Sequence, residues 1–103
     1  MPFYMKHFTV IQALDEYETL ADQVRNGQLE WYEYWQTLDM REGFDDGNWT
    51  LSAVERTRLN ELDKIIKKHL LPTIDKYNRT EEYHNLGRHQ AKEYWWWHLG
   101  ETT

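Results

Sequence analysis

The sequence predicts an all-α protein, a single compact domain of four or five helices over residues 1–103, built around a central amphipathic helix at 52–70. Three observations predict this class. Apolar residues recur at helical spacing in successive stretches, capping residues precede several of them, and turn-forming residues separate them. A chain of 103 residues with 40% hydrophobic content can bury one core of modest size.

Ser52 is expected to begin the central helix, because its side chain can cap the first turn while Glu55, three residues on, reaches back to the Ser52 N–H. Six apolar residues share one arc of the helical wheel: Val54, Leu59, Leu62, Ile65, Ile66 and Leu70. Seven polar residues are placed opposite: Arg56, Asn60, Glu61, Asp63, Lys64, Lys67 and Lys68. Pro72 lacks an N–H, so we expect a change of direction there and a short helix at 72–78.

An apolar N-terminal arm at 1–8 is expected to pack on the body and to lead into a helix at 9–25. Thr9 is the expected N-cap with Gln12 completing a capping box, and Asn26-Gly27 is a helix stop. The aromatic stretch that follows is interpreted as a helix at 28–40. Its alternation also permits a strand, but no second strand is available to pair with it.

The turn formers of 41–50 predict a loop, and Thr80 is the expected cap of a last helix at 80–99. Three consecutive tryptophans on a helix span about 200° of the wheel, so one face cannot bury them all. The wheel points Trp96 outward, near His89 and Lys92, and places Trp95 on the flank. Cover by the arm or by the 41–50 loop is one interpretation of Trp96, and a partner surface is the other.

Composition limits the possible location and partners of the protein. The chain has no cysteine, its start is too short and polar for a signal peptide, and it has no apolar run of membrane length, so we expect a cytoplasmic protein that does not bind membranes. The net charge is −6: residues 1–50 carry ten acids and three bases, giving −7, and residues 51–103 carry eight acids and nine bases, giving +1. The acidic front half favours a basic partner.

No motif indicates an enzyme, a cofactor or a metal site. Glu81 and His84 have a ligand-pair spacing, but the second copy that a carboxylate-bridged metal bundle needs is missing. The acidic turn at 45–48 lacks the register of a calcium loop. The lysines of the central helix are interrupted by acids, so direct binding of nucleic acid is not expected.

The small size, acidity and surplus of Trp and Tyr resemble the composition of accessory proteins encoded by bacteriophages, a resemblance without a shared motif. We therefore expect a non-enzymatic protein-binding module, in one form an inhibitor of a host nucleic-acid enzyme. Its partner would be a protein with a basic surface. The alternative is a structural subunit, a virion component or homo-oligomer, that buries an exposed Trp edge against a copy of itself. Ten residues are the expected partner contacts: Trp95, Trp96, His89, Lys92, Asp15, Glu16, Glu18, Asp22, Glu30 and Glu33.

Overall fold

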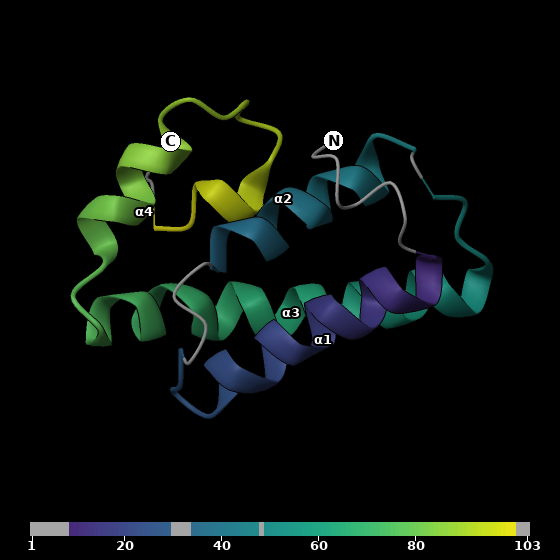
Figure 1. Cartoon of the computed structure of the whole chain (residues 1–103), viewed down its shortest axis with the longest axis horizontal. Helices are drawn as coiled ribbons and strands as arrows, with labels where there is room; N and C mark the ends of the chain where they lie inside the picture. Colours follow the sequence, from purple (N-terminus) through teal and green to yellow (C-terminus); the bar gives the residue numbers. More distant parts are fainter. Residues whose placement is uncertain (1–8, 30–33, 48, 101–103) are drawn as a thin grey trace.

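The computed structural model describes residues 9–29, 34–47 and 49–100, and within them it confirms an all-α fold without strands. The elements in chain order are helices α1 (Val10–Arg25), α2 (Tyr34–Asp45), α3 (Ala53–Lys76) and α4 (Thr80–Gly87), followed by a 3₁₀ helix, η2 (Trp95–Trp97). Helices α1 and α3 lie side by side and run in the same direction, while α2 runs the opposite way (Figure 1). The expected arm at 1–8 lies outside the described residues.

Two capping boxes start the parallel helices, as the sequence predicts. The Thr9 hydroxyl accepts from the Gln12 N–H at 3.1 Å, and the Ser52 hydroxyl accepts from the Glu55 N–H at 3.1 Å. Helix α1 ends at Arg25, before Gly27 with φ of 69°, a left-handed conformation that glycine adopts without strain. Local capping chemistry therefore fixes these boundaries.

Helix α3 continues through Pro72 to Lys76, so the predicted break and separate helix at 72–78 are wrong. Contacts with the end of α1 hold the last turn in place. The Thr73 hydroxyl donates to the Val24 carbonyl at 3.0 Å, and the Lys76 ammonium donates to the Gly27 carbonyl at 3.0 Å. Tertiary bonds thus offset the backbone hydrogen bond that proline cannot make.

Helix α2 extends further along the chain than predicted, ending at Asp45 rather than near residue 40. Residues 30–33 of the predicted helix lie outside the described part of the chain. Arg41 and Phe44, both assigned to the loop, are instead buried residues of α2. The Phe44 ring packs against Trp49 with centroids 4.9 Å apart, which ties the shortened loop back to the helix.

The predicted last helix at 80–99 is wrong beyond Gly87, where α4 ends and the chain folds back. A Cβ atom on Gly87 would lie 2.4 Å from the Trp97 carbonyl oxygen, so only glycine allows this return. The Tyr83 and Trp97 rings stack with centroids 6.0 Å apart. On a continuous helix the two residues would be separated by about 21 Å along the axis. Thr80 is the first residue of α4 and not its cap.

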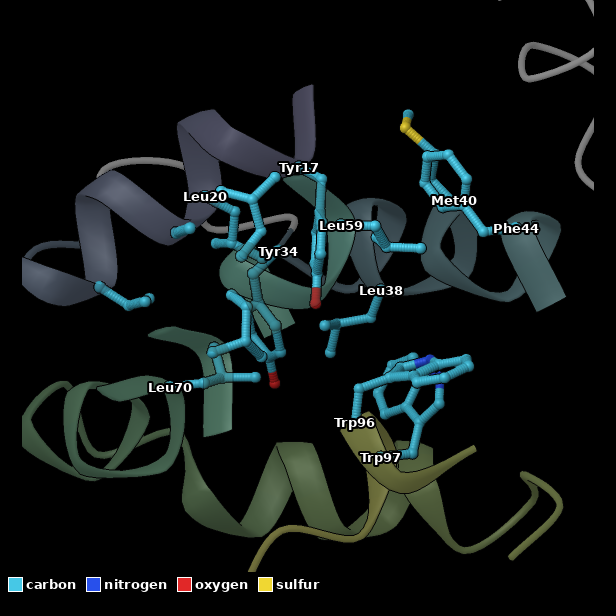
Figure 2. Close-up of a cluster of buried hydrophobic side chains, with 14 of the residues drawn as sticks. Tyr17, Leu20, Tyr34, Leu38, Met40, Phe44, Leu59, Leu70, Trp96 and Trp97 are labelled. Carbon is cyan, nitrogen blue, oxygen red and sulfur yellow. The ribbon is translucent and has the colours of Figure 1, made fainter. Parts of the chain in front are cut away.

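The core lies where the helices and the returning C-terminal segment meet. Figure 2 shows side chains from α1, α2 and α3 converging on Trp96 and Trp97. These two tryptophans are 0% and 2% exposed, and they are the largest fully buried side chains in the described part of the chain. The C-terminal segment is therefore an integral part of the core.

Candidate functional site

A buried ion pair between Arg41 of α2 and Asp63 of α3 lies at the centre of the molecule. The Arg41 Nε and Nη2 atoms each donate to one Asp63 carboxylate oxygen, both at 2.9 Å. The Tyr17 hydroxyl of α1 donates to the same carboxylate at 2.6 Å. Arg41 Nη1 donates to Asp45 at 2.9 Å. One carboxylate thus joins the three long helices.

The network joins the Arg41 guanidinium and the Tyr17 hydroxyl to the Asp63 carboxylate. Burial works to lower the pKa of Arg41, but the hydrogen bonds and charges of Asp63 and the hydrogen bond to Asp45 raise it above its usual value. Burial, together with the charge of Asp63, raises the pKa of the Tyr17 hydroxyl well above its usual value. Arg41 stays protonated and Tyr17 stays a donor, so the network is stable near neutral pH.

Sequence reasoning missed this network. Asp63 was placed on the polar side of α3, but at 100° per residue it lies between Leu70 and Ile74, inside the apolar arc. It is 8% exposed. An acid at the centre of an apolar arc is a signal that a buried cation is needed, because an unpaired buried charge is very costly. Because Arg41 was assigned to a loop, it was not identified as the cation of this pair.

Aromatic rings of the C-terminal segment cover the ion pair. The Arg41 guanidinium lies 4.7 Å from the centroid of the Trp96 ring, and Lys67 of α3 lies 4.7 Å from the Trp95 ring. The Trp96 ring also stacks on Tyr94 with centroids 5.3 Å apart. The Tyr83 hydroxyl donates to the Trp96 carbonyl at 2.7 Å and accepts from the Leu99 N–H at 3.0 Å. Arg41 therefore provides the cover that Trp96 needs.

The expectation of an outward-facing Trp96 is wrong, because it was derived from the wheel of a helix that does not form. Trp96 is fully buried, and Trp95 is half-buried against it, with ring centroids 5.5 Å apart. His89 and Lys92 are exposed on the turns between α4 and η2. The predicted Trp edge thus offers a partner only part of Trp95, with His89 and Lys92 nearby.

The predicted acidic contacts of α1 lie on its surface, but several are paired within the chain. Arg58 of α3 donates to Asp15 at 2.7 Å and to Glu18 at 3.1 Å. Asp22 pairs with Arg25 at 2.6 Å. Glu16 is exposed, and the structure gives it no ion-pair partner among the described residues. Glu30 and Glu33 lie outside the described residues.

Near the start of α1 and of α3, one aliphatic side chain of each helix is exposed to solvent. Ile11 is 60% exposed and Val54 is 79% exposed. Each lies one turn before a member of the Asp15–Arg58 pair, which joins the two parallel helices. Ile11 and Val54 therefore flank the same junction, at the end where both helices begin (Figure 1).

We call the solvent side of this junction the outer face. It contains ten residues: Ile11, Asp15, Glu18, Asp22, Arg25, Val54, Arg58, Glu61, Lys68 and Lys76. The Lys76 ammonium donates to the Gly27 carbonyl, just after the end of α1, at the far end of this face. The large exposed apolar groups of the face, Ile11 and Val54, thus lie together at the end where both helices begin.

The described residues form no candidate metal site, and they line an open hollow along α3. No cluster of three or more His, Cys, Asp or Glu side chains there could hold a metal ion. An open hollow of about 400 Å³ runs along α3. Its lining mixes charges of both signs and polar groups: Thr57, Asn60, Glu61, Asp63, Lys64 and Lys67. Its buried member, Asp63, is already engaged by Arg41 and Tyr17.

Comparison with known proteins adds no further class to the all-α fold. No family model, curated protein or solved structure matches the chain. Among the described residues, no helix has the length and apolar character needed to cross a membrane.

Proposed function

We propose that this chain is a non-enzymatic protein-binding module that holds a partner with a basic surface on the N-terminal half of the outer face. The exposure of Val54, 79%, and of Ile11, 60%, carries the proposal. Scattered exposed apolar residues are ordinary, but these two flank one helix junction beside a group of carboxylates. Burying one such aliphatic side chain fully is worth about 1.5–3 kcal/mol, enough to anchor a contact.

The charge around this apolar pair supports a basic partner. Asp15, Glu18 and Glu61 supply three negative charges and Arg58 supplies one positive charge, leaving a net −2. Charges at the rim of an interface mainly steer encounter and set specificity, and their effect falls as salt rises. The apolar pair then supplies affinity while the carboxylates supply selection.

The specific form of the proposal is inhibition of a nucleic-acid enzyme. Such an enzyme needs a basic cleft, because its substrate is a polyanion. An acidic surface with an apolar anchor occupies that cleft without offering a bond to cleave or extend. This form keeps the bacteriophage-type role that the composition suggests.

The test is affinity capture from the native host with the full chain and three variants. Glu61→Lys changes an exposed carboxylate of the outer face, and Val54→Ser removes the apolar anchor. Glu93→Lys is the matched control, because Glu93 is exposed on the turn before η2. All four proteins are first compared by thermal unfolding, so that loss of binding is not loss of fold.

The proposal expects a captured protein that is retained by the wild type and by Glu93→Lys. Both Glu61→Lys and Val54→Ser should reduce its retention, and so should an increase from 50 to 500 mM salt. Capture that is indifferent to salt and to both variants overturns the proposal, as does the absence of any specific protein.

A further inference from the structure

We propose that the turn directly after α2 is a site of spontaneous covalent modification, at which Asp46 rearranges to isoaspartate. An aspartate or asparagine that precedes glycine can cyclise on the main chain, because the glycine nitrogen carries no bulky neighbour. The chain has two such pairs, Asn26-Gly27 after α1 and Asp46-Gly47 after α2. The structure restrains the first pair and leaves the second open. This inference does not rest on the proposed function.

The reaction needs the groups of the turn itself and water. The Gly47 nitrogen attacks the side-chain carbonyl carbon of Asp46, so that a C–N bond forms and a C–O bond breaks. The carboxyl OH leaves with the amide proton as water. A water molecule then adds to the main-chain carbonyl carbon of Asp46 and breaks its bond to the nitrogen. That carbon becomes the free carboxylate, the chain continues through the former side chain, and the mass is unchanged.

The Asp46-Gly47 turn has room for this ring closure. Both residues are exposed, and a Cβ atom built on Gly47, at φ of 78°, would meet no atom within 4 Å. Among the described residues the Gly47 N–H has no hydrogen-bond acceptor, so its nitrogen is available to attack. The Asp46 carboxylate accepts from the Tyr94 hydroxyl at 3.3 Å, which is longer than an ordinary O–H···O bond. This turn is therefore weakly restrained.

The Asn26-Gly27 turn is held by hydrogen bonds on every group that the reaction needs. The Gly27 N–H donates to the Val24 carbonyl at 3.0 Å, and the Asn26 side-chain amide donates to the Asp22 carbonyl at 3.0 Å. The Gly27 carbonyl accepts from the Lys76 ammonium at 3.0 Å. The turn must open before its ring can close, and local opening of a bonded segment costs free energy. The fold therefore slows deamidation of Asn26.

The modification changes a contact between α2 and the C-terminal segment. In isoaspartate the main chain gains the Cβ atom, and the carboxylate lies one bond closer to Cα. The hydrogen bond from the Tyr94 hydroxyl to the Asp46 side chain should therefore be lost. Tyr94 stacks on Trp96, which in turn covers Arg41. Rearrangement at residue 46 thus loosens one end of the layer over the buried ion pair.

The experiment follows both turns in the folded full chain, held at pH 7.4 and 37 °C for eight weeks. Trypsin cuts after Arg25, Arg41 and Arg56, so fragments 26–41 and 42–56 report the two pairs separately. Free peptides of the same two sequences are the unfolded reference. Labelling by an isoaspartyl methyltransferase detects isoaspartate, and a change of fragment mass detects deamidation. We expect Asp46 in the chain to react within threefold of the free peptide, and Asn26 to react at least tenfold more slowly than its peptide.

Two variants assign the signal to one residue. Asp46→Glu keeps an exposed carboxylate but cannot close a five-membered imide, so fragment 42–56 should lose its label. Asp45→Glu is the matched control, because Asp45 does not precede glycine, and its label should persist. Three outcomes overturn the proposal: no label on 42–56 of the chain while the free peptide acquires it, a label that survives Asp46→Glu, or deamidation of Asn26 at the rate of its free peptide.

Discussion

Arg41 and Asp63 form a two-pronged ion pair, Nε to Oδ1 and Nη2 to Oδ2, both at 2.9 Å, beneath the ring of Trp96. The pair joins α2 to α3 in a place where an isolated charge of either sign could not be solvated. Its further contacts come from Tyr17 of α1, Asp45 of α2 and the η2 rings, so it couples the C-terminal segment to the three long helices.

Breaking this pair should be among the most costly single changes. Arg41→Met leaves the Asp63 carboxylate buried and uncompensated, which should reduce the free energy of unfolding by about 3–5 kcal/mol. Urea unfolding followed by far-UV circular dichroism measures the loss. Arg25→Met is the matched control: Arg25 pairs with Asp22 on the surface, and its loss should cost less than about 1 kcal/mol. Equal effects of the two variants would contradict a buried pair.

The Tyr17 hydroxyl should make stability fall at high pH. Its pKa is raised in the folded chain, by burial and by Asp63, so the unfolded chain loses the proton first. Above about pH 10, each pH unit should therefore remove about 1.4 kcal/mol until Tyr17 ionises in the folded chain. Urea unfolding of wild type and Tyr17→Phe at pH 7 and 11 measures this. The advantage of the wild type should shrink at pH 11, and a constant advantage would count against the assignment.

Asp39 should oppose folding at neutral pH. Burial, with Glu42 nearby, raises its pKa to about 6 from 3.8. The folded chain then holds a proton that the unfolded chain releases, so stability falls as the pH rises from 4 toward 7. Asp39→Asn should be more stable than wild type by about 1–2 kcal/mol at pH 7.5 and equally stable at pH 4. Chemical unfolding at both pH values tests this, and a gain that does not depend on pH would contradict it.

Gly87 should not tolerate a side chain. The added Cβ atom of Gly87→Ala would meet the Trp97 carbonyl oxygen at 2.4 Å, so the returning segment must shift. We expect a loss of about 1–3 kcal/mol, together with red-shifted tryptophan emission at equilibrium. Asn85→Ala, an exposed change in the same helix, is the control. A Gly87→Ala variant as stable as Asn85→Ala would mean that the chain does not fold back here.

Local signals predicted much of this fold, and long-range contacts decided the rest. Residues within a few positions of one another form the capping boxes at Thr9 and Ser52 and the stop at Gly27. Those helix boundaries were therefore predicted correctly. The continuation of α3 past Pro72 depends on bonds from Thr73 and Lys76 to the end of α1. The end of α4 depends on Trp97 returning to Gly87. No window of local sequence contains either contact.

The candidate site shows the same division. The exposure of the α1 acids followed from helical periodicity, but their pairing with Arg58 required the packing of α1 on α3. Trp96 was wrongly predicted to face outward, because the helical wheel assumed one continuous helix over residues 80–99. Val54 was assigned to the apolar arc but is 79% exposed, because it lies at the edge of that arc, about 140° around α3 from Leu59.

The central claim is that the outer face, and not the C-terminal Trp edge, holds the partner. The most direct measurement is the dissociation constant of the captured protein for Val54→Glu and for Lys92→Glu, an exposed change beside Trp95. The account predicts that Val54→Glu weakens binding at least tenfold while Lys92→Glu stays within twofold of wild type. Loss of binding in Lys92→Glu with full binding in Val54→Glu would contradict it.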